Sequence, residues 1–178
     1  MIRIFDFIFS LIGLILSSPL LILIFLCGLL DSGSPIFIQK RVGQNCKYFF
    51  LIKFRTMPIN TKSLGTHLTK NIKLSKFGSF LRKTKLDEIL QLYNVVIGDM
   101  SLVGPRPCLL NQRKLVYERK KRQVFKVKPG ITGLAQITGI TMKTPILLAK
   151  TDLKMIKEMN LNNYFYYIFM TLILIFKK

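Results

Sequence analysis

The sequence is poor in acidic residues, cysteine and histidine. Of its 178 residues only eight are Asp or Glu, against 28 Lys or Arg, so the formal net charge is +20. The three cysteines are widely spaced and odd in number, which excludes a disulfide framework or a metal-binding motif and indicates reduced thiols, as on a cytoplasmic face. The single histidine, His67, is interpreted as a solvated residue of a loop expected over residues 58–70. Half of the residues are hydrophobic, which is unusual for a simple basic nucleic-acid binder and favours contact with anionic lipid or phosphate.

A long hydrophobic run without charge lies near the N-terminus. It extends over 24 residues, from Phe7 to Leu30. About 20 apolar residues are enough for a membrane helix, and the Leu, Ile and Phe content favours insertion. The run is too long for the apolar core of a signal peptide, and no cleavage site of the A-x-A type follows it. We therefore expect residues 1–30 to form a membrane helix and residues 31–178 to form a separate domain.

A break is expected in the middle of this helix. Pro19 has no amide hydrogen, so the carbonyl of Ile15 loses its helical partner, and residues 17–18, both serine, can bond back to the preceding turn. A break of this kind permits a re-entrant hairpin, although kinked spanning helices are also common. Positive charge flanks both ends, at Arg3 and at residues 40–41, which favours both ends lying on the cytoplasmic side. From the residues alone the two arrangements stay open.

The remaining chain has the pattern of a small mixed α+β domain without internal repeats. Two strands are predicted around a turn at Gly43, and their sequences are "IFIQKRVGQN" and "YFFLIKFRTM". Helical patterns follow in "KLSKFGSFLRKT" and, very basic, over residues 111–127. Near the C-terminus, "YFYYIFMTLILIF" is apolar for 13 residues, which is short for a span and typical of an amphipathic helix in the membrane interface.

Two of the eight acids stand side by side at Asp87 and Glu88, in "KTKLDEILQLYN". Thr84 and Asp87 fit a capping box, which predicts a helix that begins here and ends at Gly98. Acids in a first turn can simply stabilise the helix. They can also form a catalytic site, with a carboxylate nucleophile beside a Mg²⁺ ligand and a phosphoryl group at the helix N-terminus.

Basic groups near the acid pair are candidates for phosphate binding. In "GDMSLVGPRP" the two prolines fix the backbone around Arg106, and we call residues 105–107 the Pro-Arg-Pro turn. In "KFRTM", Lys53 and Arg55 share one face of the expected strand. A solvated arginine and a solvated strand face are the simpler interpretations. "KVKPGITGLAQITG" predicts a type II turn at residues 129–130 and indicates no catalytic role.

Taken together, these segments resemble one family. Six segments occur in the order typical of the monotopic phosphoglycosyl transferases, the bacterial sugar transferase family. They are "RIFDF", "SSP", "FIQKRVG", "KFRTM", "FGSFLRKTKLDEILQLYNVVIGDMSLVGPRP" and "KVKPGITGLAQITG". The resemblance covers nearly the whole chain and is most specific between Phe77 and Pro107. The chain is similar to the minimal form of the family, which carries only the catalytic domain.

The resemblance implies a reaction and a set of site residues. A sugar 1-phosphate would pass from a UDP-sugar to polyprenol (undecaprenyl) phosphate with Mg²⁺ as cofactor, which releases UMP and starts glycan assembly. Asp87 would be the nucleophile that forms a covalent phosphosugar intermediate, and Glu88 would hold Mg²⁺ together with it. Substrate binding would involve five residues: Lys53, Arg55, Arg82, Arg106 and Asp152.

The resemblance also implies a place in the cell. Arg3 and the break at Ser18 and Pro19 would set a re-entrant helix into the cytoplasmic leaflet of the bacterial inner membrane. The expected partners are the UDP-sugar, polyprenol phosphate, anionic lipids and downstream glycosyltransferases, but not nucleic acid. Departures from the family pattern, among them Phe125 and residues 138–140, bear on the choice of sugar more than on the reaction.

Two alternatives stay open. A non-catalytic basic membrane adaptor, which binds anionic lipid or nucleic acid, would depend on neither Asp87 nor Mg²⁺, and its binding would weaken steeply with salt. A transferase without a covalent intermediate would use Asp87 only as a metal ligand and would show ternary-complex rather than ping-pong kinetics.

Overall fold

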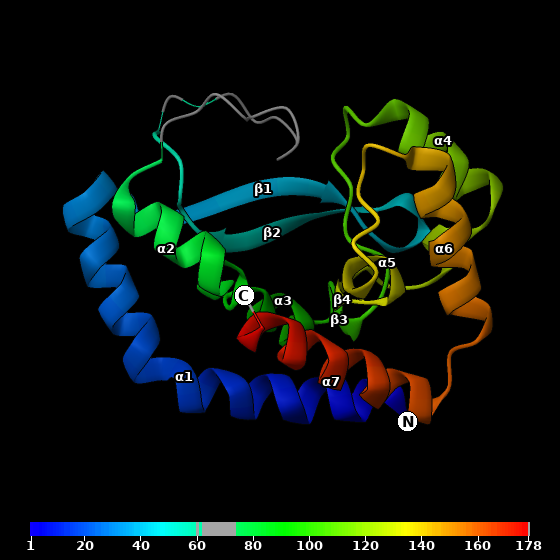
Figure 1. The fold of residues 1–178 in the computed structure, drawn as a ribbon, viewed down its shortest axis with the longest axis horizontal. Helices are drawn as coiled ribbons and strands as arrows, with labels where there is room; N and C mark the ends of the chain where they lie inside the picture. Colours follow the sequence, from blue (N-terminus) through cyan, green and yellow to red (C-terminus); the bar gives the residue numbers. More distant parts are fainter. Residues whose placement is uncertain (60, 62–73, 178) are drawn as a thin grey trace.

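The mixed helix and strand fold is confirmed (Figure 1). The structure is a computed structural model that describes residues 1–59, 61 and 74–177, so His67 and most of the loop expected over residues 58–70 lie outside the described residues. In chain order the elements are α1 (Ile2–Ser32), β1 (Ile36–Val42), η1 (Gln44–Cys46), β2 (Tyr48–Phe54), α2 (Lys76–Thr84), η3 (Leu86–Glu88), α3 (Gln91–Ile97), β3 (Ser101–Val103), α4 (Arg113–Lys121), η4 (Val124–Lys126), β4 (Gly130–Thr132), α5 (Leu134–Ile137), α6 (Pro145–Lys157) and α7 (Leu161–Phe176).

The apolar helix α1 is bent rather than interrupted. It is long and apolar enough to cross a membrane, and Pro19 lies inside it. The Ser18 hydroxyl donates to the Ile15 carbonyl at 2.8 Å, so the oxygen that Pro19 deprives of a partner is satisfied within the helix. Ser17 donates in the same way to Gly13 at 2.6 Å. Figure 1 shows the consequence, since the axis of α1 turns sharply partway along.

Both halves of α1 pack on the rest of the chain, while its outer side is exposed. In the N-terminal half, Ile2 and Phe5 contact a cluster built by β3, α6 and α7. In the C-terminal half, Ile24 is buried in a second cluster formed with β2 and α2. Between the two, Leu16 is 76% exposed, and most of the helix surface is open. An apolar helix of a soluble core would be mostly buried, so this exposure favours a membrane environment.

Polar contacts tie the first turns of α1 to distant elements. Arg3 donates to the carbonyl oxygens of Val95 and Val96, at 2.5 and 2.9 Å, and so caps the C-terminal end of α3. Asp6 is 2% exposed, and its Oδ1 accepts from the Leu102 N–H and the Tyr164 hydroxyl, both at 2.9 Å. The N-terminal end of α1 is therefore fixed to the domain.

The helix α7 lies along the N-terminal half of α1 (Figure 1). Phe165 meets Phe5 edge to face, with ring centroids 5.4 Å apart. Tyr164 and Tyr167 face inward and are buried, whereas Phe169 is 63% exposed. The predicted C-terminal helix is confirmed, and its apolar outer side suits the membrane interface expected from the sequence.

The strands form two small sheets. β1 and β2 make the predicted antiparallel hairpin, with Ile38 opposite Ile52. β3 and β4 pair in parallel, with Val103 opposite Thr132. The type II turn predicted at Gly130 is wrong, because that glycine does not adopt a positive φ. A glycine is needed at position 130 for a different reason: a Cβ there would lie 2.0 Å from the amide nitrogen of Gly104, which directly follows β3.

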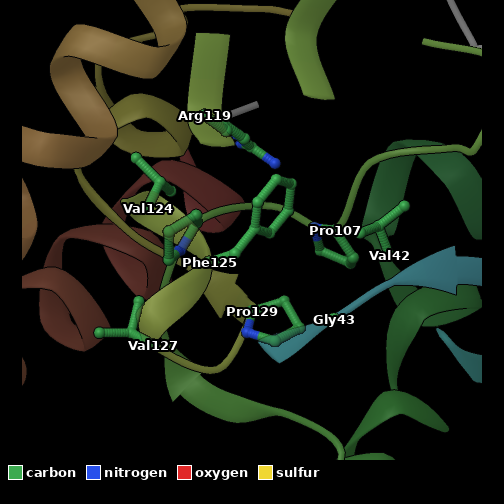
Figure 2. A pocket seen from close by; sticks show the side chains of 9 residues that line it. Val42, Gly43, Pro107, Arg119, Val124, Phe125, Val127 and Pro129 are labelled. Atoms are coloured by element: carbon green, nitrogen blue, oxygen red, sulfur yellow. The ribbon is translucent and has the colours of Figure 1, made fainter. Parts of the chain in front are cut away.

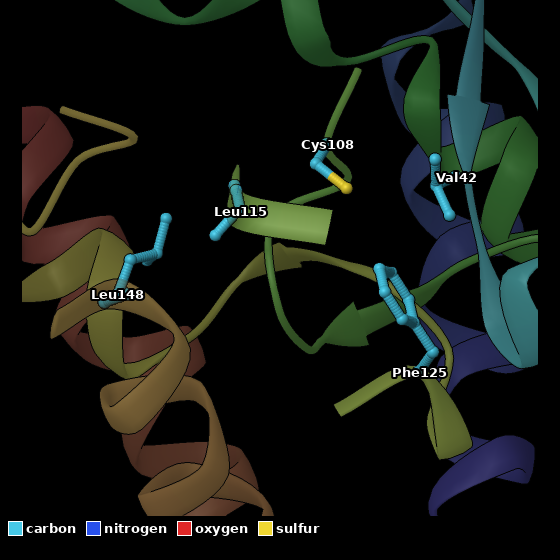
Figure 3. Close-up of a cluster of buried hydrophobic side chains, with 6 residues drawn as sticks. Val42, Cys108, Leu115, Phe125 and Leu148 are labelled. Atoms are coloured by element: carbon cyan, nitrogen blue, oxygen red, sulfur yellow. The ribbon is translucent and has the colours of Figure 1, made fainter. Parts of the chain in front are cut away.

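A hydrophobic core joins the hairpin to α4 and α6 (Figure 3). Its buried members are Val42, Cys108, Leu115, Phe125, Ala135 and Leu148. The helix predicted over residues 111–127 is shorter than expected, because Gln123 adopts a left-handed φ of 58° between α4 and the 3₁₀ turn η4. Phe125, one of the departures from the family pattern noted above, lies in this core.

Candidate active site

The acid pair lies in a short turn between two helices. α2 ends where Lys85 adopts a left-handed φ of 62°, and η3 follows with both acids. The capping box predicted for Thr84 and Asp87 is wrong, because Thr84 is the last residue of α2 and its hydroxyl donates to the Phe80 carbonyl at 2.8 Å. α3 then ends at Gly98, as predicted, with a φ of 96°. The acids therefore stand at a bend of the backbone and not in the first turn of a long helix.

The two neighbouring carboxylates have different surroundings. Asp87 is 5% exposed and makes no hydrogen bond among the described residues, and burial together with the charge of Glu88 raises its pKa. Glu88 accepts a hydrogen bond from Arg106 and forms an ion pair with it. Burial opposes ionisation of Glu88, but the charges of Arg106 and Lys85 outweigh it and lower its pKa to about 2. The charge of Glu88 is thus balanced by Arg106, whereas the carboxylate of Asp87 has no hydrogen-bond partner among the described residues.

The Pro-Arg-Pro turn presents Arg106 to Glu88. Its side chain is 41% exposed, and the charge of Glu88 raises its pKa. Behind the turn, Arg119 donates to the carbonyl oxygen of Arg106 at 2.7 Å. Arg41 donates to the carbonyl oxygen of Pro107 at 3.0 Å. The direction of the Arg106 side chain is therefore fixed through the backbone of the turn.

A pocket lies behind the Pro-Arg-Pro turn (Figure 2). It is lined by both prolines of the turn, by Arg119, and by Val124 and Phe125 of η4. In Figure 2 the Arg119 side chain points from α4 into this pocket, above the ring of Phe125. The walls are mostly apolar, so the arginine is the charged group that the pocket surrounds.

Two more of the predicted cations face the acid pair. The Lys53 ammonium lies 5.3 Å from the centre of the Phe37 ring. Burial lowers the pKa of Lys53 to about 8, although the charge of Asp87 acts in the opposite direction. Arg82 donates to the Thr56 hydroxyl at 3.0 Å, and its charge favours ionisation of Asp87. Lys53, Arg82 and Arg106 thus lie close enough to the carboxylates for their charges to act on them, while their binding of substrate stays a prediction.

Arg55 and Asp152 do not contact the acid pair in this structure. Arg55 donates to the carbonyl oxygens of Ser34 and Ile36, at 2.7 and 3.1 Å, so it fastens the end of β2 to the start of β1. Asp152 is 1% exposed and accepts from Arg119 Nε at 2.9 Å. Whether either residue meets a substrate stays a prediction from the family resemblance.

The acid pair fits a Mg²⁺ site of the kind that needs substrate to be complete. The part of the chain that the structure describes holds no cluster of three or more His, Cys, Asp or Glu side chains. Mg²⁺ prefers oxygen ligands and is commonly held by one or two carboxylates together with substrate phosphates and water. Asp87 and Glu88 supply two such carboxylates, and the oxygens of Asp87 are not engaged in hydrogen bonds with described residues.

Arg41 is a site residue that the sequence did not reveal. Burial and the charge of Arg106 lower its pKa to about 10, and its Nε is buried without a hydrogen-bond partner among the described residues. The strand alternation carried a usable signal, because Phe37 and Arg41 stand on the same face of β1 and Phe37 is opposite Lys53. The site therefore contains more cations than acids, which favours an anionic ligand.

Comparison with known proteins shows that the chain is similar to sugar transferases. A family model described as "Bacterial sugar transferase" matches residues 1–178. The "Uncharacterized sugar transferase EpsL" of Bacillus subtilis (strain 168) is 43% identical over 138 residues, which are 77% of this chain and 68% of that protein.

Two further relatives have names that state a reaction. The "UDP-glucose:undecaprenyl-phosphate glucose-1-phosphate transferase" of Klebsiella pneumoniae is 43% identical over 152 residues, covering 82% of this chain and 32% of that protein. The "Undecaprenyl-phosphate galactose phosphotransferase" of Salmonella typhimurium is 36% identical over 154 residues, covering 77% and 32%. The chain thus spans about a third of the length of these two relatives and 68% of EpsL.

Proposed function

The chain belongs to the bacterial sugar transferase family, and we propose that it transfers a sugar 1-phosphate from a UDP-sugar to undecaprenyl phosphate. The observation that carries the proposal is the contrast between the two acids. Glu88 is neutralised by Arg106, whereas Asp87 is buried, free of hydrogen bonds with described residues and surrounded by Lys53, Lys85 and Arg82. A carboxylate in such a place can approach a phosphate anion, because the neighbouring cations offset the repulsion.

We infer that Asp87 is the nucleophile. Its oxygen attacks the phosphorus that carries the sugar, so an aspartyl–phosphorus bond forms while the bond between this phosphorus and the bridging oxygen breaks. UMP leaves with the bonding electron pair. In the second half-reaction a phosphate oxygen of the lipid attacks the same phosphorus, the aspartyl bond breaks, and Asp87 returns to its ionised form. The raised pKa of Asp87 makes it more basic, and so more nucleophilic, than an exposed carboxylate.

The remaining residues bind and orient the phosphates. Arg106 has a partly exposed side chain and a guanidinium fork whose shape matches phosphate geometry, and its bond to Glu88 holds the fork next to the acid pair. Lys53 on β2 and Arg82 on α2 lie near enough to Asp87 for their charges to act on its carboxylate. Mg²⁺ held by the acid pair and substrate phosphates would withdraw negative charge from the transferred group.

We propose that α1 enters the membrane from the cytoplasmic face and returns to it. Arg3 is bonded to α3 at one end of the helix, and Ile24 packs with β2 and α2 near the other, so both halves lie against the same domain. A helix that crossed the bilayer would place its two ends on opposite sides. The bend at Pro19 and the exposed Leu16 are consistent with a hairpin-like entry into one leaflet. The apolar outer side of α7 would rest on the same surface.

UMP release tests the proposal. The enzyme would be assayed in detergent with Mg²⁺, undecaprenyl phosphate and a panel of UDP-sugars that includes UDP-glucose and UDP-galactose. We expect turnover with at least one donor, its loss in Asp87→Asn, and near-normal activity in the matched control Asp99→Asn, whose carboxylate lies outside the site. Omission of the lipid should leave a phosphosugar adduct on the wild type, detectable by intact mass.

Three results would contradict the proposal in different ways. Full turnover in Asp87→Asn would remove the aspartyl mechanism. Turnover that needs Asp87 but gives no adduct, together with ternary-complex kinetics, would favour direct transfer to the lipid. Absence of turnover with every nucleotide sugar, combined with salt-sensitive vesicle binding that ignores Asp87, would favour a membrane adaptor.

A further inference from the structure

The Pro-Arg-Pro turn is held in place by two arginines from other parts of the chain. Prolines lack an amide hydrogen, so this turn cannot hold its own shape with a full set of backbone hydrogen bonds. Arg119 donates from α4 to the carbonyl oxygen of Arg106 at 2.7 Å, and Arg41 donates from β1 to the next carbonyl oxygen, that of Pro107, at 3.0 Å. Two consecutive carbonyl groups are therefore fixed from two sides.

The arginine on α4 is in turn held by a buried carboxylate. Arg119 Nε donates to Asp152 Oδ2 at 2.9 Å, and Nη2 lies 2.8 Å from the same oxygen. The two side chains are 2% and 1% exposed. Removing both charges from water costs about as much as their attraction returns, so an apolar pair of similar volume would serve stability at least as well. Stability therefore does not explain why this pair is charged. The need for a hydrogen-bond donor that points at the Pro-Arg-Pro turn does explain it.

A continuous line of contacts leads from this pair to the acid pair. Asp152 orients Arg119, Arg119 fixes the carbonyl group of Arg106, and the guanidinium of Arg106 binds Glu88. We propose that Arg119 and Asp152 are positioning residues that hold Arg106 where it meets Glu88 and a substrate phosphate. The inference rests on the proposed function, and it assigns Asp152 a role in which two residues, Arg119 and Arg106, separate it from the substrate.

A double-mutant cycle between Arg119 and Arg106 tests the inference. Arg119→Met keeps the volume of the side chain but removes the donor. We expect it to lower kcat/KM for UMP release by about 10- to 100-fold in the wild-type background, the range that follows from a misplaced binding group. In the Arg106→Ala background, where nothing is left to position, we expect less than about a twofold further loss. The change in thermal midpoint should be the same in both backgrounds.

Two other variants separate positioning from folding. Arg122→Met removes an arginine that directly follows α4 and pairs with Glu118 instead of the turn, so it serves as the matched control and should leave kcat/KM unchanged. Arg119→Lys keeps a positive charge for Asp152 but lacks the planar fork that reaches two partners at once. If Arg119→Met does not fold, Arg119→Lys should still show the loss of kcat/KM that depends on Arg106.

Hydrogen exchange supplies a readout that is independent of turnover. Amides of residues 101–108 should exchange faster in Arg119→Met and in Asp152→Asn, and at the wild-type rate in Arg122→Met. A wild type that transfers no sugar phosphate but shows this pattern would overturn the proposed function and support the positioning of the turn. An active wild type in which Arg119→Met costs the same kcat/KM with and without Arg106, or costs nothing, would overturn the positioning role alone.

Discussion

Substitution of Lys53 by arginine should change how the reaction responds to alkaline pH. Burial lowers the pKa of Lys53 to about 8, so its charge is partly lost just above neutral pH. At pH 9 only about one tenth of an amine with this pKa is protonated, and kcat/KM should fall about tenfold if the charge binds phosphate. Arginine stays protonated throughout this range. Lys53→Arg should therefore keep its activity at pH values where the wild type loses it.

The assay is the pH profile of kcat/KM for UMP release, from about pH 6.5 to about pH 10. The alkaline midpoint of the wild type should lie near the pKa of Lys53, about 8, and should move upward or disappear in Lys53→Arg. Lys47→Arg, a change at an exposed lysine of the hairpin turn, should leave the profile unchanged and serves as the control. If the wild type and Lys53→Arg lose activity with the same midpoint, Lys53 does not act through its charge.

The same lowered pKa implies that Lys53 destabilises the fold. The pKa of Lys53 is about 8 in the folded protein and 10.5 for a lysine in the unfolded chain, so the folded protein binds the proton of this ammonium group less tightly. The penalty is complete below about pH 8, shrinks as the pH rises toward the unfolded value and is absent above it. It amounts to about 3 kcal/mol at neutral pH. Lys53→Met should thus unfold at a higher temperature than the wild type at pH 7 while losing activity. A lower thermal unfolding midpoint in this variant would show that the buried Lys53 does not destabilise the fold.

Three further outcomes follow from the structure. Tyr164→Phe removes one donor to the buried carboxylate of Asp6 and should lower the free energy of unfolding in detergent by about 1.5–3 kcal/mol, whereas an unchanged midpoint would mean that this bond contributes little. Gly130→Ala places a Cβ 2.0 Å from the Gly104 nitrogen and should cost about 3 kcal/mol or more, so normal expression and melting would show that β3 and β4 can separate without harm. Chelation with EDTA should abolish UMP release and added Mg²⁺ should restore it, and activity that persists in EDTA would exclude the metal role of the acid pair.

The parts of the fold that follow local patterns could be predicted from the sequence. The hairpin has two strands around Gly43 in which buried and exposed residues tend to alternate, and the bend of α1 follows from a proline preceded by two serines. The prediction of a capping box at Thr84 was wrong because the same residues also fit the last turn of a preceding helix, where the Thr84 hydroxyl donates to the carbonyl oxygen of Phe80. The early end of α4 depends on the left-handed conformation of Gln123, for which the residue type gives no signal.

In the site, the residues near the acids were predicted and those behind them were not. Lys53 and Arg106 stand in short motifs, so their type and spacing indicate phosphate binding. Arg41 and Arg119 bond to carbonyl groups 66 and 13 residues away, and these partners are brought near only by the packing of β1 and α4 on the turn. Asp152 was predicted to bind substrate, and its pairing with Arg119 was not predicted for the same reason, since that partner is 33 residues away on another helix.

The buried contacts of Asp6 set an order of events during biosynthesis. Its hydrogen-bond donors at Leu102 and Tyr164 lie 96 and 158 residues further along the chain, so they leave the ribosome long after α1. Until then the carboxylate has no partner, and entry into an apolar phase would be costly. The first turns of α1 must therefore wait in water or among lipid headgroups while the rest is translated. Docking of α1 is a late step that completes only after α7 has been made, although α1 is the first element to be synthesised.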